Sequence, residues 1–435
     1  MPGTSAAEDR MRLNIFLLFT ALNLSSANSG TTSWIEANQA ISAEKLLANV
    51  SAPGTALGSV IASPSTRDPD YFFHWTRDAA LAMDAVVLLD ERAPSREARM
   101  PYRRALLDYI YFSRLNQMSG APSDLGEPKF LVSGMPFLGP WGRPQNDGPA
   151  IRAITLIRFA RTLLREGQSE LVRTMLYDSR LPTFSVIKTD LEYVSHHALE
   201  ESFDLWEEVK GQHFYTRMVT RRALIEGALL ARELGDPRAA DWYEERALLL
   251  TREIEAHWDP IRQVIRPTLS RSEGADYKYS ELDTAVILGV LHGDAGDGFF
   301  SSNDPRVIAT MTKQKEVFAR IYPINQGGHF PGIAIGRYPE DRYSGSDFLG
   351  GNPWVLTTLA FAELLYRRLA LVSPEMRAGL RSEADAYIAR VAAHSHPDGS
   401  LAEQIDRRSG YMISARDLTW NYAAMLTAWH AAQYP

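Results

Sequence analysis

Apolar residues recur along most of the chain at the three- and four-residue spacing of one helix face. Between Ala79 and Leu89, for example, Leu81, Ala85 and Leu88 follow this spacing, which places their side chains on one side of a helix. Similar stretches cover 100–117, 147–166, 214–234, 238–257, 304–319, 353–371, 374–394 and 414–433. The alternation of apolar and polar residues that marks strands is scarce. The pattern therefore predicts an all-α protein.

These helical stretches follow one another from about residue 36 without an obvious linker. The chain has 435 residues, of which 45% are hydrophobic and 23% charged, as expected for a globular protein with a substantial core. We therefore predict one large domain. A helix bundle, a solenoid and a toroid all remain compatible with the periodicity alone.

The N-terminus has the features of a signal peptide. Arg10 and Arg12 form a basic flank, Leu13–Leu24 an apolar core, and Ser25 and Ala27 are small residues spaced for cleavage. The apolar run is too short to span a bilayer. We expect a signal peptide over 1–27, a catalytic domain over 28–435, and a secreted or periplasmic protein. The alternative is an ordinary apolar helix at the start of a cytoplasmic protein.

Charge and composition exclude several classes of protein. The net charge is −7 and no basic block is present, so we expect no nucleic-acid partner. The absence of cysteine excludes a disulfide framework and thiolate metal sites. The doublet His196-His197 lacks metal-ligand spacing, and no phosphate-binding loop, Rossmann fingerprint or serine nucleophile elbow occurs. We therefore expect neither a metal nor a cofactor.

Three segments have the composition of helix starts. Asn352 followed by Pro353 is typical of an N-cap and first helical residue. Ser414 and Asp417 have the spacing of a capping box. Thr76 is a candidate cap for the next helix. Loops that enter helices at one end of a domain are a natural place for a site.

An acidic cluster is the strongest chemical signal. Asp204–Val209 places three carboxylates within five positions, which is unfavourable because crowded like charges repel. Such a cluster is useful if one carboxyl stays protonated and acts as a general acid, with Leu205 and Trp206 as an apolar wall that raises its pKa. The alternative is an acidic helix end or a solvated loop. Glycoside hydrolysis requires two carboxyl groups; Glu207 is the candidate acid and Glu403 the candidate partner.

Five segments are rich in residue types that bind sugars, namely aromatic residues, arginine and carboxylates. Aromatic rings cover the flat C–H faces of sugars, while arginine and carboxylate groups bind hydroxyls directionally. For each tryptophan the alternative is packing in the core. The segments are 71–78, 141–145, 204–209, 336–341 and 402–406.

Taken together and in order, these segments resemble the glucoamylases of glycoside hydrolase family 15. The similarity covers nearly everything after about residue 36. It implies an (α/α)6 toroid, in which six outer helices surround six inner ones and a pocket lies at one end. The matching segments are 62–66, 69–72, 75–78, 126–130, 141–149, 204–209, 336–341, 351–354 and 414–420.

The resemblance also implies an activity. It is the inverting, exo-acting release of β-glucose from the non-reducing ends of α-1,4-glucans, with slower α-1,6 cleavage, by a monomer without cofactor. Glu207 matches the general acid, Glu403 the general base and Glu208 a substrate-binding carboxylate. The other residues that match the substrate-binding positions are Tyr71, Trp75, Arg77, Asp78, Trp141, Trp206, Arg337, Asp341 and Trp354.

Some positions depart from the fungal pattern. His74 and Phe203 are expected to alter pocket polarity, and 188–190 to change contacts beyond the first sugar. The segment 342–350 is longer than in many fungal members. No starch-binding module follows the matching region, so strong adsorption to raw starch is not expected.

Three other functions compete with this one. Dextran, trehalose or a short α-glucoside could replace the α-1,4-glucan as substrate. A phosphorylase or a non-catalytic carbohydrate-sensing domain could use the same fold. Glu403 argues against a phosphorylase, which needs no carboxylate base. The presence of both Glu207 and Glu403 argues against a sensor, which needs neither.

Overall fold

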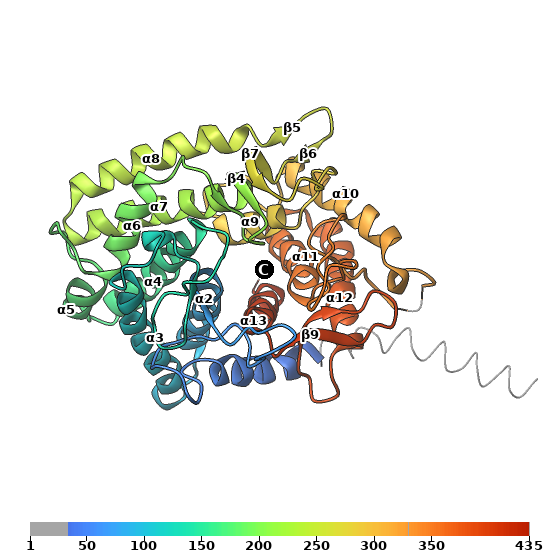
Figure 1. Cartoon of the computed structure of the whole chain (residues 1–435), viewed down its shortest axis with the longest axis horizontal. Helices are drawn as coiled ribbons and strands as arrows, with labels where there is room; N and C mark the ends of the chain where they lie inside the picture. The colour runs from blue at the N-terminus through green and yellow to red at the C-terminus, as the bar shows by residue number, and fades with distance from the viewer. Residues whose placement is uncertain (1–33, 329, 435) are drawn as a thin grey trace, which may run out of the picture.

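The computed structural model describes residues 34–328 and 330–434, so the predicted signal peptide lies outside the described residues. Six inner helices pack each against the next, and the last packs against the first, which closes a ring (Figure 1). This closure confirms the (α/α)6 toroid and rules out the bundle and the solenoid. The inner helices are α2 (Thr76–Arg92), α4 (Asp147–Arg165), α7 (Phe214–Leu234), α9 (Ala285–Gly293), α11 (Val355–Arg368) and α13 (Thr419–Gln433).

An outer helix packs on each of five inner ones. Each outer helix contacts the inner helix next to it in the sequence. They are α3 (Arg96–Gln117) on α2, α6 (Val186–His196) on α4, α8 (Pro237–Glu255) on α7, α10 (Pro305–Ile321) on α9 and α12 (Pro374–His394) on α11. A further helix covers 34–48. Short helical turns are α5 (Ser169–Leu171), η1 (Asp124–Gly126), η2 (Val172–Leu176), η3 (Pro323–Asn325) and η4 (Leu369–Leu371).

The two rings differ in how much of each helix is buried. The inner helix α9 buries every residue except His292. Its Gly293 lies so close to α7 that an added Cβ would be 2.6 Å from Cβ of Met218. The outer helix α10 buries a single stripe through Val307, Met311 and Phe318, as an amphipathic surface helix does.

All nine predicted helical stretches contain a helix, and three helices were missed: the one at 34–48, the outer helix α6 and the inner helix α9. The helix α9 is short and apolar all round, so its sequence has no polar face to reveal the period. The helix α6 buries Lys188 and Asp190, which look like surface residues in a sequence. Hydrophobic periodicity detects amphipathic helices; α9 has no polar face, and in α6 the two charged residues on the buried face interrupt the apolar pattern.

The three predicted caps are wrong, because tertiary partners use the same side chains. Thr76 is the first residue of α2, and its hydroxyl donates to the carbonyl of Glu127. Asn352 precedes the start of α11 and donates through Nδ2 to Oε1 of Gln404. Ser414 lies in a strand, and α13 begins only at Thr419.

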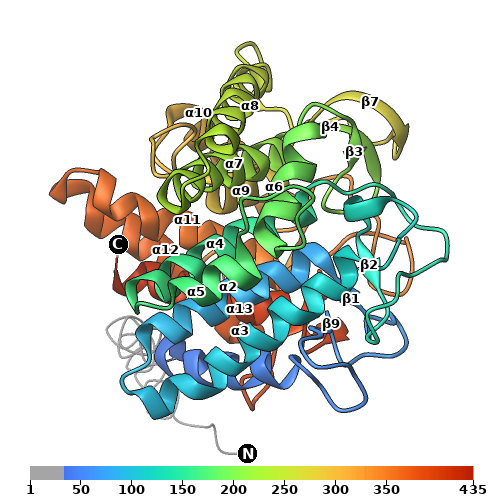
Figure 2. The same ribbon diagram turned by 90° about the vertical axis from the view of Figure 1, so that its left-hand side faces the viewer.

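Short antiparallel strands join the helices, and Figure 2 shows most of them gathered at one end of the ring. Strands of two to seven residues are too short to show clear alternation, which is why the sequence did not reveal them. The pairs are β1 (His74–Trp75) with β2 (Lys129–Phe130), β5 (Trp258–Asp259) with β6 (Val264–Ile265), and β8 (Ala402–Ile405) with β9 (Met412–Arg416); β3 (Ser202–Phe203), β4 (Val209–His213) and β7 (Thr268–Gly274) form a three-stranded sheet.

Candidate active site

A cavity of about 680 Å³ opens at the strand-bearing end of the toroid. Its size is typical of sites for small molecules and short oligomers. The cavity brings together residues from distant parts of the chain, including both candidate catalytic carboxyls. The predicted site residues in its wall are Tyr71, Trp75, Arg77, Asp78, Trp141, Trp206, Glu207, Glu208, Arg337, Trp354 and Glu403.

The acidic cluster is the loop of a β-hairpin between β3 and β4. Asp204 stabilises this loop, because its Oδ1 accepts from the backbone N–H groups of Glu208 at 2.7 Å and Val209 at 2.9 Å. Glu207 has a φ of +66°, a left-handed conformation that is uncommon for residues other than glycine. The cluster is therefore an ordered loop, and neither a helix end nor a solvated segment.

The side chain of Glu207 is held by one of its two oxygens. Its Oε1 accepts from Nε1 of Trp75 at 2.9 Å and from Nε2 of Gln145 at 3.0 Å. Nη2 of Arg77 lies 3.9 Å from the same oxygen. Since Oε2 accepts no hydrogen bond from the described residues, it is the oxygen free to hold a proton toward the cavity.

The hydrogen-bond and ring contacts of Trp206 are with residues other than Glu207, for which the sequence suggested it as an apolar wall. Its Nε1 donates to Oδ1 of Asp283 at 2.8 Å, and its ring faces Trp354 with 5.9 Å between centroids. Trp206 thus forms part of the cavity wall. The tryptophan that binds Glu207 is Trp75, which is 132 positions away.

The side chain of Glu403 is buried on β8. Its Oε2 accepts hydrogen bonds from Oγ of Ser414 and from Nε2 of Gln404, the latter at 3.0 Å. Burial raises the pKa of Glu403 to about 7, although the hydroxyls of Ser414 and Tyr71 and the charge of Arg337 act in the opposite direction. An ionised Glu403 is therefore a stronger base than an exposed glutamate.

Tyr71 lies near both candidate catalytic carboxyls. Its hydroxyl is 2.9 Å from that of Tyr343. Burial raises the pKa of Tyr71 well above its usual value, and the charges of Glu403 and Glu207 raise it further. The phenol therefore stays protonated and available as a donor next to both glutamates.

Several polar atoms in the cavity wall make no hydrogen bond. Among the described residues, Nε1 of Trp141 and Nε1 of Trp354 are buried without a hydrogen bond, and Nε of Arg77 and Oδ2 of Asp78 make only an ion pair with each other at 3.4 Å. Burial also raises the pKa of Asp78 to about 6, against the effect of the Arg77 charge. Unpartnered buried polar groups are costly and uncommon in native proteins. The two free indole N–H groups are donors that suit a ligand with hydroxyl groups.

The guanidinium of Arg337 is held between two carboxylates. It binds Asp341 through two hydrogen bonds of 2.7 and 2.8 Å, and its Nη2 also donates to Oε1 of Glu208 at 2.8 Å. Tyr338 donates to the other oxygen of Glu208 at 2.6 Å. Asp341 is absent from the cavity wall. It therefore orients Arg337 from behind.

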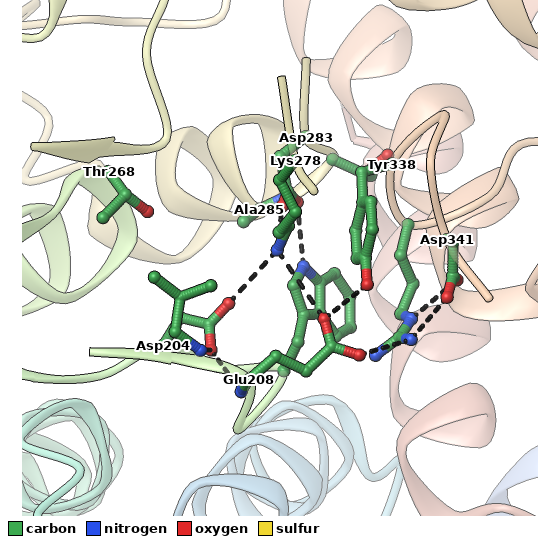
Figure 3. A network of polar contacts seen from close by, with 12 residues as sticks. Asp204, Glu208, Thr268, Lys278, Asp283, Ala285, Tyr338 and Asp341 are labelled. Carbon is green, nitrogen blue, oxygen red and sulfur yellow. Dashed lines mark hydrogen bonds and ion pairs between the residues drawn. The ribbon is translucent and has the colours of Figure 1, made fainter. Parts of the chain in front are cut away.

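Lys278 is a central cation that the sequence analysis missed. Figure 3 shows it between three carboxylates: its Nζ lies 3.0 Å from Asp283, 3.4 Å from Asp204 and 3.7 Å from Glu208. Burial would raise the pKa of Asp204, but the charge of Lys278 leaves it below its usual value. Burial does raise the pKa of Glu208, against the charges of Arg337 and Lys278. No motif or spacing in the sequence marks Lys278.

Lys129 organises the opposite wall of the cavity. It stands across from Trp75 in the β1–β2 pair, and its Nζ lies 3.7–4.5 Å from the ring centroids of Trp141, Phe73, Phe137 and Trp75. Contacts of this kind between an ammonium and aromatic rings are attractive. Burial lowers the pKa of Lys129 to about 8. This lysine was visible within a matching motif but was not predicted as a site residue.

Other residues singled out in the sequence lie away from the cavity. His74, Phe203 and residues 188–190 are absent from its wall, so none of them changes pocket polarity or sugar contacts directly. His74 is buried and accepts from the backbone N–H of Val60. His197 contacts the carboxylate of Glu200. Within residues 34–328 and 330–434, no group of side chains is arranged to hold a metal ion, and no helix is long and apolar enough to cross a bilayer.

Comparison with known families agrees with this geometry. The model of the family described as glycosyl hydrolases family 15 matches residues 37–380 and 375–430. The chain belongs to glycosyl hydrolase family 15. This family 15 member is a glycoside hydrolase of the glucan 1,4-α-glucosidase type.

Curated relatives of this family 15 hydrolase match over most of its length. The glucoamylase of Blastobotrys adeninivorans is 38% identical over 91% of this chain and 71% of its own. Glucoamylase 1 of Rhizopus oryzae is 35% identical over 93% and 72%. The probable glucoamylase of Schizosaccharomyces pombe is 32% identical over 93% of both chains. A relative from Saccharomyces cerevisiae, 30% identical, is named as intracellular, so family membership leaves the compartment of this hydrolase a prediction.

Solved structures confirm the fold. The family 15 glucoamylase from Hypocrea jecorina superposes with a TM-score of 0.83 at 31% identity, over 93% of this chain and 72% of that one. The glucoamylase from Saccharomycopsis fibuligera gives a TM-score of 0.82 at 28% identity, over 93% and 95%. The family 15 hydrolase therefore has the toroid of these enzymes.

Proposed function

We propose that the protein is an inverting, exo-acting glucoamylase. It removes single glucose units from the non-reducing ends of starch, glycogen or maltooligosaccharides, cleaves α-1,4 bonds faster than α-1,6 bonds, and releases β-D-glucose. One observation supports this most strongly. Glu207 and Glu403 come from separate hairpins, each is held by its own hydrogen bonds, and both line one cavity with aromatic and charged walls.

Glu207 acts as the general acid. Its Oε2, free of other hydrogen bonds among the described residues, carries the proton to the glycosidic oxygen, while Trp75 and Gln145 hold Oε1. The bond between the anomeric carbon and this oxygen breaks, and its electron pair stays on the leaving oxygen. Positive charge develops on the sugar ring, as in other glycosidases.

Glu403 acts as the general base. In its ionised form it takes a proton from a water molecule that attacks the anomeric carbon on the face opposite the leaving group, so the configuration inverts to β. Ser414 and Gln404 keep the carboxylate in place. After turnover Glu403 holds one additional proton and Glu207 lacks one, and exchange with solvent restores both.

The terminal glucose is bound by hydrogen bonds and by aromatic rings. Arg77 and Asp78 line the cavity as an ion pair, and they offer N–H donors and carboxylate acceptors to sugar hydroxyls. Arg337 and Glu208 form the opposite polar group, and Asp341 orients Arg337. The remaining predicted binding residues, Tyr71, Trp75, Trp141, Trp206 and Trp354, line the walls, where they cover the C–H faces of the sugar.

The anomer of glucose that is released first distinguishes an inverting from a retaining mechanism. Proton NMR of maltoheptaose hydrolysis should show β-glucose first, with α-glucose appearing only by mutarotation; initial α-glucose would refute inversion. A panel of maltose, maltoheptaose, starch, isomaltose, dextran and trehalose tests linkage. Preference for dextran or trehalose would contradict the α-1,4 assignment. Glucose 1-phosphate formed only with phosphate would identify a phosphorylase.

A further inference from the structure

We propose that Phe348 is an outer binding platform for an α-glucan chain, placed at the rim of the catalytic cavity. It would contact a glucosyl unit beyond the bond being cleaved and favour longer maltooligosaccharides over maltose. This inference rests on the proposed function, because it concerns the part of the glucan substrate that extends out of the same cavity.

An aromatic ladder leads from the interior of the cavity to Phe348. Ring centroids are 5.9 Å apart for Trp206 and Trp354, 6.2 Å for Trp354 and Tyr343, and 5.9 Å for Tyr343 and Phe348. All four residues line the cavity. The exposed fraction is 8% at Trp206 and 6% at Trp354 but 68% at Phe348. One wall of the cavity is therefore aromatic from its buried part to the solvent.

The exposure of Phe348 fits a binding role. A single exposed apolar residue is ordinary on a protein surface, but this one continues the wall of a sugar-binding cavity. Sugars in an α-glucan present flat C–H faces at each unit. A chain that extends from the buried wall toward solvent therefore meets an exposed ring where its second or third unit emerges.

The loop that bears Phe348 is closed by its own hydrogen bonds. The backbone N–H of Ser344 donates to the carbonyl of Asp347 at 2.9 Å, and that of Gly350 donates to the carbonyl of Arg342 at 3.0 Å. The carboxylate of Asp347 accepts from the N–H of Leu349 at 3.0 Å. Such closure reduces the ordering that binding would otherwise require. The segment 342–350, which is longer than in many fungal members of the family, thus presents a ring at the cavity mouth.

Leu349 provides a matched control in the same turn. It is more exposed than Phe348, at 91%, and equally apolar. It lines a separate polar cavity with Asp68, Arg408 and Ser414, and it is absent from the catalytic wall. Truncation of Leu349 therefore perturbs the turn without removing the platform.

The test compares F348A, F348W and L349A on maltose, maltotriose and maltoheptaose. F348A should lower the ratio of kcat/KM for maltoheptaose to that for maltose about threefold to tenfold, the range expected for one aromatic contact. F348W should retain the ratio, and L349A should match the wild type. An unchanged ratio in F348A, or an equal loss in L349A, would overturn the platform.

A binding measurement separates the platform from catalysis. In an E207Q background, calorimetry should show that F348A weakens maltoheptaose binding by a similar factor. Thermal unfolding of F348A should match the wild type, which excludes a folding defect. If the wild type fails to release β-glucose from maltoheptaose, the proposed function fails. If it does release β-glucose and F348A binds normally, only the platform is wrong.

Discussion

Ser414 donates a hydrogen bond from Oγ to Oε2 of Glu403, across the irregular part of the β8–β9 pair. Ser414 has a φ of +70°, a conformation that L-residues adopt only where the surroundings impose it. The strand irregularity thus points a hydroxyl at the proposed base. A serine that looks like a helix cap in the sequence therefore binds the proposed base.

Loss of this hydroxyl should change the pH dependence of activity. A hydrogen bond to the carboxylate stabilises its charged form, so S414A should raise the pKa of Glu403 above its already high value. Because the base must be ionised, the acidic limb of kcat/KM should move to higher pH by about 1 unit. The measurement is a pH profile on maltose.

S414G separates this effect from backbone strain. Glycine adopts a positive φ without penalty, whereas alanine does not, so S414G should unfold at a higher temperature than S414A. Both variants lack the hydroxyl, so the acidic limb of kcat/KM should move to higher pH by the same amount in both. A wild-type limb in S414G would contradict the assigned hydrogen bond.

The buried charge of Glu403 should make the protein less stable as pH rises. Its pKa is raised in the folded state, so the folded protein binds more protons than the unfolded chain between about pH 4.5 and 7. Stability is therefore lost as pH rises through this window. E403Q should raise the Tm by about 2 °C at pH 8, and the gain should shrink below pH 4.5. Equal gains at both pH values would contradict the raised pKa.

Adjacent glutamates should give different kinetic defects. E207Q removes the proton donor and should reduce kcat by about a thousandfold with little change in the Tm. E208Q removes a charge that is bound by Arg337 and Tyr338 and should raise KM about tenfold. Steady-state kinetics on maltose and maltotriose measure the kcat defect of E207Q and the KM defect of E208Q. Near-full activity in E207Q would exclude it as the acid.

Removal of Lys278 should destabilise the carboxylate network. K278M leaves Asp204, Glu208 and Asp283 without their shared cation, at a cost of about 3 kcal/mol in the free energy of unfolding. The deficit should be larger at pH 8 than at pH 5, because protonation at low pH relieves the repulsion. Urea unfolding at both pH values measures it.

K278R is the control for this network. Arginine keeps the positive charge, so K278R should recover most of the stability lost in K278M. A deficit in K278M that does not depend on pH would show that Lys278 contributes by packing alone.

The sequence by itself determined most of the helices, and eleven of the twelve residues that it predicted for the site lie in the cavity wall. Helical periodicity is local, since it depends on residues three and four apart, and it therefore survives without tertiary information. The sequence also supplied the proposal that Glu207 and Glu403 act as a pair, because glycoside hydrolysis requires two carboxyls and the surrounding motifs resemble one family.

Only the tertiary structure decided which side chains meet. The ring closes through contacts between α13 and α2, which no local pattern encodes. Glu207 binds Trp75 from 132 positions away, and Lys278 reaches Asp204 across 74. The same long-range contacts placed Asp341 behind Arg337 and brought Ser414 to Glu403. A hydrogen bond depends on the distance between atoms in space, and for residues far apart in the chain that distance is set by the fold.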